Sequence, residues 1–215
     1  MTKQFAVIGL GRFGSSLAKT LYKSGHQVLA VDNSHENIQK MMDEVTHCVQ
    51  ADATDEDALK NLGLRNFDVV VVAIGHDMQS SILVTVLLKE LGVPFVVAKA
   101  NSALHGKVLA RVGADKVVYP ERDMGERLAK SLVSSNVLDY IDISPEHSIM
   151  EIVAGEHLSN KTIGELNLRA KYGITVMVIK SKGKIQVAPG ANDLINTGDV
   201  LVAIGKTTSL QKIAS

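Results

Sequence analysis

Three glycines near the start of the sequence have the spacing of a phosphate-binding loop. Gly9, Gly11 and Gly14 stand where an apolar run at residues 5–9 passes into a helix-like segment that begins at Ser15. The first glycine permits a tight turn, the second lets a phosphate approach the backbone, and the third lets the helix pack against the strand. The helix N-terminus would direct N–H groups and its positive dipole end at an anion. The spacing therefore predicts a bound phosphate group.

Two charged residues narrow this ligand to a nucleotide. Asp32 ends the second apolar run, 18 residues after Gly14, where a carboxylate commonly accepts a ribose hydroxyl. Such a carboxylate would repel the 2′-phosphate of NADP, but it accepts NAD. Arg12 stands inside the loop, where a cation opposes the helix dipole unless a phosphate pairs with it. The two residues leave ATP, ADP and NAD or NADH as alternatives.

Further polar residues follow the other predicted strands. Ligands of open parallel sheets bind at the C-terminal ends of the strands, so residues at these positions are candidates for contact. For each polar residue taken singly, solvation in a loop is the alternative interpretation. The candidates are Asp52 at the third strand, Gly75, His76 and Asp77 after the fourth, Lys99 and Asn101 at the fifth, and Glu121 after the sixth.

The sequence offers little for catalysis. A hydride-transfer enzyme needs an acid or base in a substrate pocket, usually on a second domain as large as the first. The C-terminal part of the chain carries only His147 and His157, both in or next to predicted turns. The common motifs of serine hydrolases, zinc proteases and P-loop enzymes are missing from the sequence. We predict that the protein is not an enzyme; a small NAD-dependent oxidoreductase and an NAD(H)-responsive sensor remain the alternatives.

The composition excludes several other classes. In 215 residues, 23 Lys and Arg balance 23 Asp and Glu, and this balance argues against a nucleic-acid partner, which requires a basic surface. The single cysteine, Cys48, permits neither an intrachain disulfide nor a cysteine-rich zinc site, and we expect it to be a buried residue of a strand. No secretory signal or membrane-spanning run is visible. These features predict a cytoplasmic protein.

Alternation of apolar runs and helix-period segments predicts the fold. The strands are expected at residues 5–9, 26–32, 46–52, 68–75, 95–100 and 115–120, and Gly25, Gly63, Gly92 and Gly113 are expected to end helices. Strands that are apolar throughout are typical of a parallel sheet covered on both faces. The fold class is therefore α/β, with a doubly wound, parallel Rossmann-like sheet.

The pattern changes after residue 120. One more helix is expected at 121–136, and then apolar and polar residues alternate, as in half-exposed strands. A hairpin turn is expected at 181–184 and a short helix at 162–173, ended by Gly173. The predicted domains are 1–120 for nucleotide binding, 121–136 for a connecting helix, and 137–215 for a small α+β domain.

Longer blocks of sequence resemble a known family. FAVIGLGRFG, LAVDNS, QADATDE, RNFD, GADKVVYPERDMG and RAKYG are similar to the cytosolic regulatory subunits of bacterial Ktr-type potassium uptake systems. These subunits consist of an RCK (or KTN) N-terminal domain and an RCK C-terminal domain. The resemblance covers essentially the whole chain, and the last three blocks are more specific than the glycine motif.

The resemblance implies a nucleotide sensor for potassium transport. It implies a homo-octameric ring, a tetramer of dimers, which docks on a membrane potassium-translocating subunit and so lies at the inner face of the cell membrane. ATP and ADP would compete without turnover, and ATP would favour transport. The predicted nucleotide-binding residues are Gly9, Gly11, Arg12, Phe13, Gly14, Asp32, Asn33, Ser34, Asp52, Ala53, Ile74, Gly75, His76, Lys99, Ala100, Asn101, His105 and Glu121.

Two further ligands are implied by the resemblance. Arg12 is expected to reach the terminal phosphate, and Glu121 to hold Mg²⁺ or another cation against it, because a bare carboxylate would repel a phosphate. The C-terminal domain is expected to bind cyclic di-AMP, which inhibits transport. The matching residues are Ile163, Arg169, Ile174 and Pro189. The alternative is that these four residues only pack the small domain.

Overall fold

Six short apolar runs of the first half of the chain form one parallel sheet. The computed structural model describes residues 2–133 and 136–214, and the chain divides into two units, Met1–Glu121 and Arg122–Ser215. Within the described part of the first unit, the strand order is β3-β2-β1-β4-β5-β6. The strands are β1 (Gln4–Ile8), β2 (Gln27–Asp32), β3 (His47–Gln50), β4 (Val69–Val72), β5 (Val96–Lys99) and β6 (Lys116–Val118). All neighbouring strands pair in parallel, which confirms the predicted fold class.

Both faces of this sheet are buried. Along β1, Ala6 and Ile8 belong to one apolar cluster, while Phe5 and Val7 belong to a second one. Successive side chains of a strand point to opposite faces, so the two clusters lie on the two sides of the sheet. This arrangement explains why the strands are apolar throughout and do not alternate.

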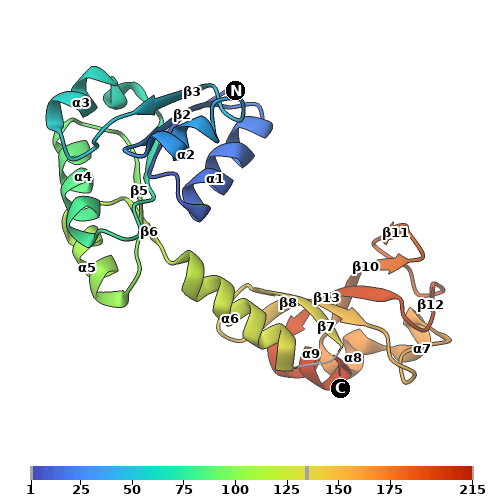
Figure 1. The fold of residues 1–215 in the computed structure, drawn as a ribbon. Helices are drawn as coiled ribbons and strands as arrows, with labels where there is room; N and C mark the ends of the chain where they lie inside the picture. The colour runs from blue at the N-terminus through green and yellow to red at the C-terminus, as the bar shows by residue number, and fades with distance from the viewer. Residues whose placement is uncertain (1, 134–135, 215) are drawn as a thin grey trace. The chain divides into compact units, whose positions relative to one another are not determined.

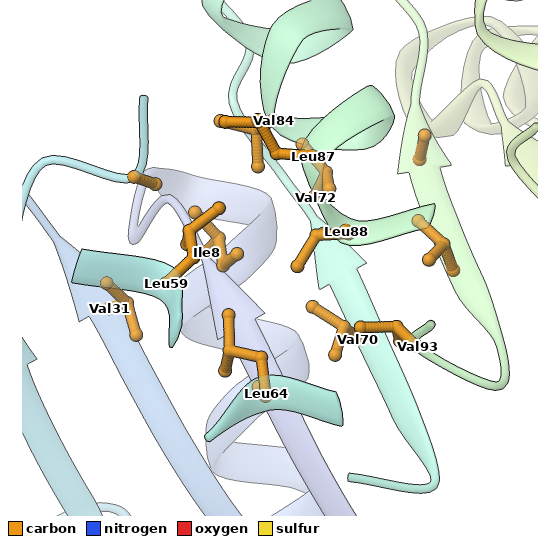
Figure 2. Close-up of a cluster of buried hydrophobic side chains, with 14 of the residues drawn as sticks. Ile8, Val31, Leu59, Leu64, Val70, Val72, Val84, Leu87, Leu88 and Val93 are labelled. Carbon is orange, nitrogen blue, oxygen red and sulfur yellow. The ribbon is translucent and has the colours of Figure 1, made fainter. Parts of the chain in front are cut away.

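Helices cover each face of the sheet (Figure 1). Leu59, Leu64, Leu88 and Leu109 pack with Ile8 on one side, and several of them are seen together in Figure 2. The elements that carry these leucines are α3 (Glu56–Asn61), the short 3₁₀ helix η1 (Leu64–Asn66), α4 (Met78–Glu90) and α5 (Ala103–Arg111). Helices α1 (Arg12–Lys23) and α2 (His35–Gln39) supply the cluster on the other side.

Local signals begin and end these helices. The side chains of Ser34, Asp55, Asp77 and Ser102 accept hydrogen bonds from the first-turn N–H groups of α2, α3, α4 and α5. The four predicted terminators, Gly25, Gly63, Gly92 and Gly113, all have positive φ, the conformation that glycine adopts most readily. Residues 34–45 have a helical sequence pattern throughout, but α2 ends at Gln39. Turns closed by hydrogen bonds from Met41 N–H to the Ile38 carbonyl and from Glu44 N–H to the Met41 carbonyl follow, and Met41 and Val45 lie in the apolar cluster.

Asp115 gives the first unit a pH-dependent part of its stability. Its carboxylate accepts the Val96 N–H at 2.7 Å and lies 2.9 Å from the Lys89 ammonium. The Val96 hydrogen bond, helped by Lys89, lowers the pKa of Asp115. A carboxyl whose pKa is depressed by folding stabilises the fold above its unfolded pKa of about 3.9, and this contribution disappears as the pH falls through the folded value.

We expect Asp115→Asn to destabilise the protein at pH 7 and to do so less at pH 3, because pH 3 lies below the unfolded pKa and the contribution of the charged carboxyl shrinks as the pH falls towards the lowered folded pKa. Urea unfolding of wild type and variant at the two pH values measures the difference. An equal loss at both pH values would mean that the charge of Asp115 is irrelevant.

The second unit is built around an antiparallel sheet (Figure 1). Its described residues form the sheet β11-β10-β13-β8-β7 and a small pair, β12-β9. On β8 and β13, alternate residues are buried, as expected for a sheet with one covered face. The strands are β7 (Val137–Asp142), β8 (His147–Val153), β9 (Lys161–Thr162), β10 (Thr175–Ser181), β11 (Lys184–Val187), β12 (Leu194–Ile195) and β13 (Val200–Lys206). The predicted hairpin turn at 181–184 joins β10 to β11.

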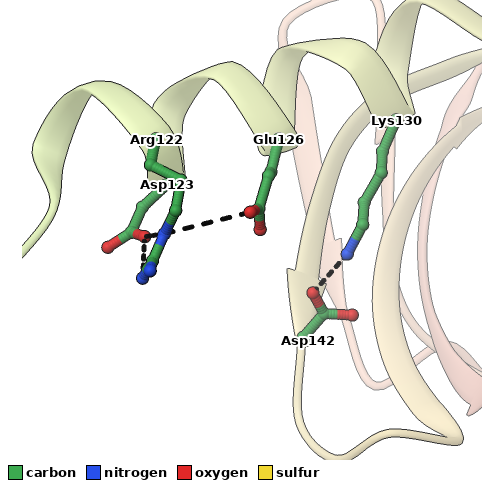
Figure 3. A network of polar contacts seen from close by, with 5 residues as sticks. All are labelled: Arg122, Asp123, Glu126, Lys130 and Asp142. Atoms are coloured by element: carbon green, nitrogen blue, oxygen red, sulfur yellow. Dashed lines mark hydrogen bonds and ion pairs between the residues drawn. The ribbon is translucent and has the colours of Figure 1, made fainter. Parts of the chain in front are cut away.

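Helix α6 (Pro120–Val133) is fixed to β7 by ion pairs. Arg127 donates two hydrogen bonds to the carboxylate of Asp139, at 2.8 and 2.5 Å. Lys130 reaches Asp142 at 2.6 Å, as Figure 3 shows, and its ammonium lies 4.6 Å from the centre of the Tyr140 ring. Of the helix predicted at 121–136, residues 134–135 lie outside the described residues, and Asn136 is in a turn.

Three sequence expectations for local structure differ from the fold. The helix predicted at 162–173 is two helices, α7 (Ile163–Leu166) and α8 (Leu168–Tyr172), because Asn167 between them adopts a left-handed conformation. A C-terminal helix, α9 (Thr207–Ala214), was not predicted; Leu210 and Ile213 bury it against the second unit's core. Cys48 does lie in strand β3, but it is only partly buried.

Candidate nucleotide-binding site

The glycine loop connects β1 to α1 through close backbone contacts. Gly9 has a φ of +94°, and its N–H donates to the carbonyl of Val31 at 2.8 Å. An added Cβ at Gly14 would lie 1.9 Å from the carbonyl oxygen of Gly9. Gly11 is the N-cap of α1 and has no side chain to bond the first-turn N–H groups, and the first turn carries no acidic residue. These N–H groups thus remain available to an anion.

A cavity of about 660 Å³ opens over this loop. Its size is in the range of small-molecule sites. Most of the predicted nucleotide contacts line it, and they come from the C-terminal ends of β1 to β5 and from the start of α6. The wall consists of Ile8, Gly9, Gly11, Arg12, Phe13, Asp32, Asn33, Ser34, Asn37, Ala51, Asp52, Ala53, Thr54, Ala73, Ile74, Gly75, His76, Asp77, Ser80, Lys99, Asn101 and Glu121.

Asp32 lines the cavity and also accepts hydrogen bonds from the backbone of the glycine loop. Its carboxylate accepts the N–H of Leu10 at 2.6 Å and that of Ser34 at 2.8 Å. The amide of Asn37 donates to the same carboxylate at 3.2 Å. A carboxylate offers about four acceptor positions, so these three bonds leave room for one ribose hydroxyl. Asn37 was missed in the sequence because its role depends on the fold of the short helix α2.

Lys99 and Glu121 form an ion pair on the cavity wall. Lys99 Nζ lies 2.5 Å from Glu121 Oε1; the lysine side chain is 10% exposed and that of the glutamate 64%. The Lys99 hydrogen bond is the main reason that the pKa of Glu121 is lowered, and the charge of Arg12 adds to the effect. The ammonium also lies 5.9 Å from the centre of the Phe13 ring. The side-chain amide of neighbouring Asn101 donates to the carbonyl of Gly75.

Two other carboxylates of the cavity are bound within their own turns. Asp52 accepts the N–H and the hydroxyl of Thr54 at 2.9 and 2.7 Å, and the hydroxyl is the main reason that the pKa of Asp52 is lowered. Asp77 caps α4 by accepting the N–H groups of Gln79 and Ser80 and the Ser80 hydroxyl. Both aspartates therefore shape loops of the cavity.

Three of the predicted contacts lie beside the cavity and do not line it. Gly14 packs α1 on β1, and Ala100 is buried. His105 is fully buried: its Nδ1 accepts the Asn101 N–H at 3.4 Å, and its Nε2 has no hydrogen-bond partner among the described residues. Burial lowers the pKa of His105, which favours the neutral ring. A direct contact of these residues with a nucleotide stays a prediction.

A cation at Glu121 would need the ligand to complete its coordination. Across residues 2–133 and 136–214, no group of three or more His, Cys, Asp or Glu side chains is arranged to hold a metal ion. Mg²⁺ is commonly held by one or two carboxylates together with phosphate oxygens and water. Glu121 supplies one carboxylate on the cavity wall, which fits that requirement.

The residues predicted for cyclic di-AMP are spread over several elements of the second unit. Ile163 begins α7, the exposed Arg169 lies on α8, and Pro189 follows β11. Ile174 is 1% exposed and belongs to the unit's apolar core. Its burial favours the packing alternative for that residue, and the site as a whole stays a prediction.

Fold and cavity define the class of the protein. A parallel sheet in the order 3-2-1-4-5-6, with a cavity over a glycine loop at the strand ends, is the architecture of Rossmann-like nucleotide-binding proteins. The TrkA-N domain model matches residues 5–120 and the TrkA-C domain model matches residues 148–215.

Known proteins show the same organisation. The chain is 49% identical to the Ktr system potassium uptake protein C of Bacillus subtilis, covering 99% of this chain and 96% of that protein. It is also 49% identical to protein A of the same system, covering 98% and 95%. The chain therefore belongs to the family of Ktr-type RCK subunits of potassium uptake systems, which confirms the resemblance seen in the sequence. Among solved structures, the GsuK RCK domain shares the fold, with a TM-score of 0.71 and 18% identity over 100% of this chain and 48% of that one.

Proposed function

We propose that this chain is a nucleotide-sensing regulatory subunit, which binds ATP and ADP and gates a membrane potassium-translocating subunit. The observation that carries the proposal is the cavity over the α1 N-terminus, with Arg12 and Lys99 on its wall. Because the chain belongs to a family of potassium uptake subunits, we propose potassium uptake as the process that it regulates. The engagement of Asp32, Asp52 and Asp77 with neighbouring N–H groups supports a site that holds a ligand without transforming it.

A gating role requires that ATP and ADP favour two shapes of the assembly to different extents. A ligand with equal affinity for both shapes would shift nothing. The difference between ATP and ADP is the γ-phosphate, so a group that contacts it is needed. Arg12 at the mouth of the loop and a cation held by Glu121 are the proposed contacts.

Titration calorimetry of the purified protein with ATP, ADP and NADH, with and without Mg²⁺, tests the proposal. We expect both adenine nucleotides to bind. Binding of NADH alone would contradict the proposal and favour the NAD-dependent oxidoreductase.

Arg12→Ala is expected to weaken ATP binding by about tenfold or more while it weakens ADP binding less, because a charge-assisted hydrogen bond to the γ-phosphate is lost. Calorimetry with each nucleotide measures the two ratios. Lys19→Ala, which removes a cation of the same helix that pairs with Glu44 at 3.1 Å, is the matched control and should change neither. Equal losses for ATP and ADP in Arg12→Ala would exclude a γ-phosphate contact.

The proposal includes a homo-octamer and a membrane partner that keeps the ring at the inner face of the cell membrane. No helix of the described residues combines the length and apolar character needed to cross a bilayer. Exposed apolar side chains on α4, α5 and α6, namely Met78, Leu83, Leu104, Leu128 and Leu132, support association with further chains. The mass of the purified protein in solution tests the octamer.

Cyclic di-AMP is the proposed inhibitory ligand of the second unit. The exposed guanidinium of Arg169 on α8 supports this, because arginine binds phosphate in a bidentate manner. Calorimetry with cyclic di-AMP tests the assignment. Binding that persists unchanged in Arg169→Ala would remove Arg169 from the site.

A further inference from the structure

The charges that line the nucleotide cavity do not favour a polyphosphate by themselves. Two cations, Arg12 and Lys99, face four carboxylates. Apart from His76, the charged side chains of the wall have a net charge of 2 − 4 = −2. A phosphate group therefore enters a cavity that is negative overall, and the arrangement of the carboxylates decides how much of that charge it meets. They are Asp32, Asp52, Asp77 and Glu121.

Three of the four carboxylates are already stabilised by the backbone. Asp32 accepts two N–H groups, Asp77 accepts two, and Asp52 accepts one together with a hydroxyl. Glu121 also has a backbone hydrogen bond, but the Lys99 ammonium, 2.5 Å from its carboxylate, is the main reason that its pKa is lowered. Removal of the Lys99 ammonium from Glu121 therefore removes the main stabilisation of this negative charge.

The position of Lys99 allows its ammonium to leave Glu121 and pair with a phosphate. It is the only lysine that lines the cavity among the residues described, and its ammonium lies 2.5 Å from Glu121. A Cβ placed on Gly75 would lie 3.3 Å from Lys99 Nζ, so the loop after β4 comes close to the ammonium because residue 75 has no side chain. A lysine ammonium has three donors on a flexible stem and changes partners readily.

We propose that Lys99 is an exchangeable counter-ion. When a phosphate group enters the cavity, the Lys99 ammonium leaves Glu121 and pairs with the phosphate. The Glu121 carboxylate, now without its ammonium, then binds a cation that the same phosphate also coordinates. Nucleotide and cation thus bind as a coupled pair. This inference deepens the proposed function and rests on it, since it assumes that the cavity binds a nucleotide.

The exchange predicts a change in nucleotide affinity that would not occur if Glu121 only bound a cation. In the absence of a divalent cation, Glu121 competes with the phosphate for Lys99 and repels the ligand. Glu121→Gln removes both effects at constant shape, so the variant should bind nucleotide about tenfold more tightly than wild type without a cation. The gain in affinity from added Mg²⁺ should shrink accordingly.

Lys99→Met should have the opposite effect. The carboxylate then has no ammonium and the phosphate loses a donor, so cation-free affinity should fall by about tenfold or more. The double variant should lose less than the single lysine variant, because removal of Glu121 relieves the repulsion. Such non-additivity is expected for two groups in direct contact.

Calorimetric titration of ADP and ATP in EDTA and in excess Mg²⁺, at fixed ionic strength, measures all four proteins. Lys89→Met is the matched control: it breaks a Lys–Asp pair of 2.9 Å that lies away from the cavity wall, and it should leave both affinities unchanged. Thermal unfolding of each variant confirms that it is folded.

The outcomes separate the two proposals. Tighter cation-free binding by Glu121→Gln, together with a non-additive double variant, supports the exchange. Wild-type binding with unchanged or weaker cation-free binding by Glu121→Gln overturns the exchange and leaves the nucleotide sensor standing. If wild type binds neither nucleotide in either condition, the proposed function fails, and the exchange fails with it.

Discussion

Gly14→Ala is expected to lower the free energy of unfolding of the first unit by about 3 kcal/mol or more. Alanine in place of glycine usually stabilises a helix by about 1 kcal/mol, and Gly14 lies inside α1. The steric effect is larger here, because the new Cβ would lie 1.9 Å from the carbonyl oxygen of Gly9 and 3.1 Å from the Cβ of Ala73. A backbone carbonyl cannot rotate aside, so helix and strand must separate.

Urea unfolding of Gly14→Ala measures this loss, and Gly11→Ala is its control. Gly11 has a φ of −64°, which any residue adopts, and an added Cβ there meets nothing within 4 Å. Its stability should stay close to that of wild type. Since Gly11 lines the cavity, the control should nevertheless weaken nucleotide binding. Equal stability of the two variants would show that the helix can shift without cost.

Asp32→Ala is expected to lose about 2–3 kcal/mol of stability and to weaken nucleotide binding severely. The carboxylate satisfies the N–H of Leu10, a residue that is 3% exposed, and also that of Ser34. Without the carboxylate, a buried donor is left without an acceptor, and the ribose hydroxyl loses its proposed partner.

Chemical denaturation and calorimetry of Asp32→Ala test both parts of this prediction. Asp52→Ala is a suitable comparison, because it removes a carboxylate of the same cavity whose hydrogen bonds stay within its own turn. Its loss of stability should be clearly smaller. Similar losses in the two variants would argue that the Leu10 bond contributes little.

The sheet of the first unit could be predicted because its central strands are buried on both faces. Val69–Val72 is an unbroken apolar run, and such a run between two helix-period segments has few other interpretations. The four glycines Gly25, Gly63, Gly92 and Gly113 also marked where helices end. The early end of α2 could not be predicted, because residues 40–45 have a helical pattern and only tertiary packing of Met41 and Val45 selects turns.

Most of the cavity wall could be predicted from one rule, that parallel strands bring their C-terminal ends to the same edge. The polar residues that were missed, Asn37, Thr54 and Ser80, lie a few positions further along, inside turns and first helical turns. Their approach to the cavity depends on the caps and turns built by Asp32, Asp52 and Asp77, which sequence spacing alone does not define.

The second unit was harder to predict, since short elements depend on single residues. Asn167 breaks the predicted helix by its left-handed backbone, a conformation that asparagine tolerates but does not require. Thr162 and Glu165 do form a capping box at the start of α7, so the beginning of that helix was readable. Helix α9 begins with two threonines and a serine, which are weak helix formers, and it is held by burial of Leu210.

The bonds of Asp32 also restrict how this lineage can change its ligand. Acceptance of a 2′-phosphate would require a neutral or basic residue in place of Asp32, and a lysine or arginine there has no acceptor for the N–H of Leu10. A change to a basic residue therefore needs a second mutation that supplies a new acceptor. Ligand preference at this position is buffered against single mutations to basic residues, and a redesign of the site would have to keep or replace the acceptor for Leu10.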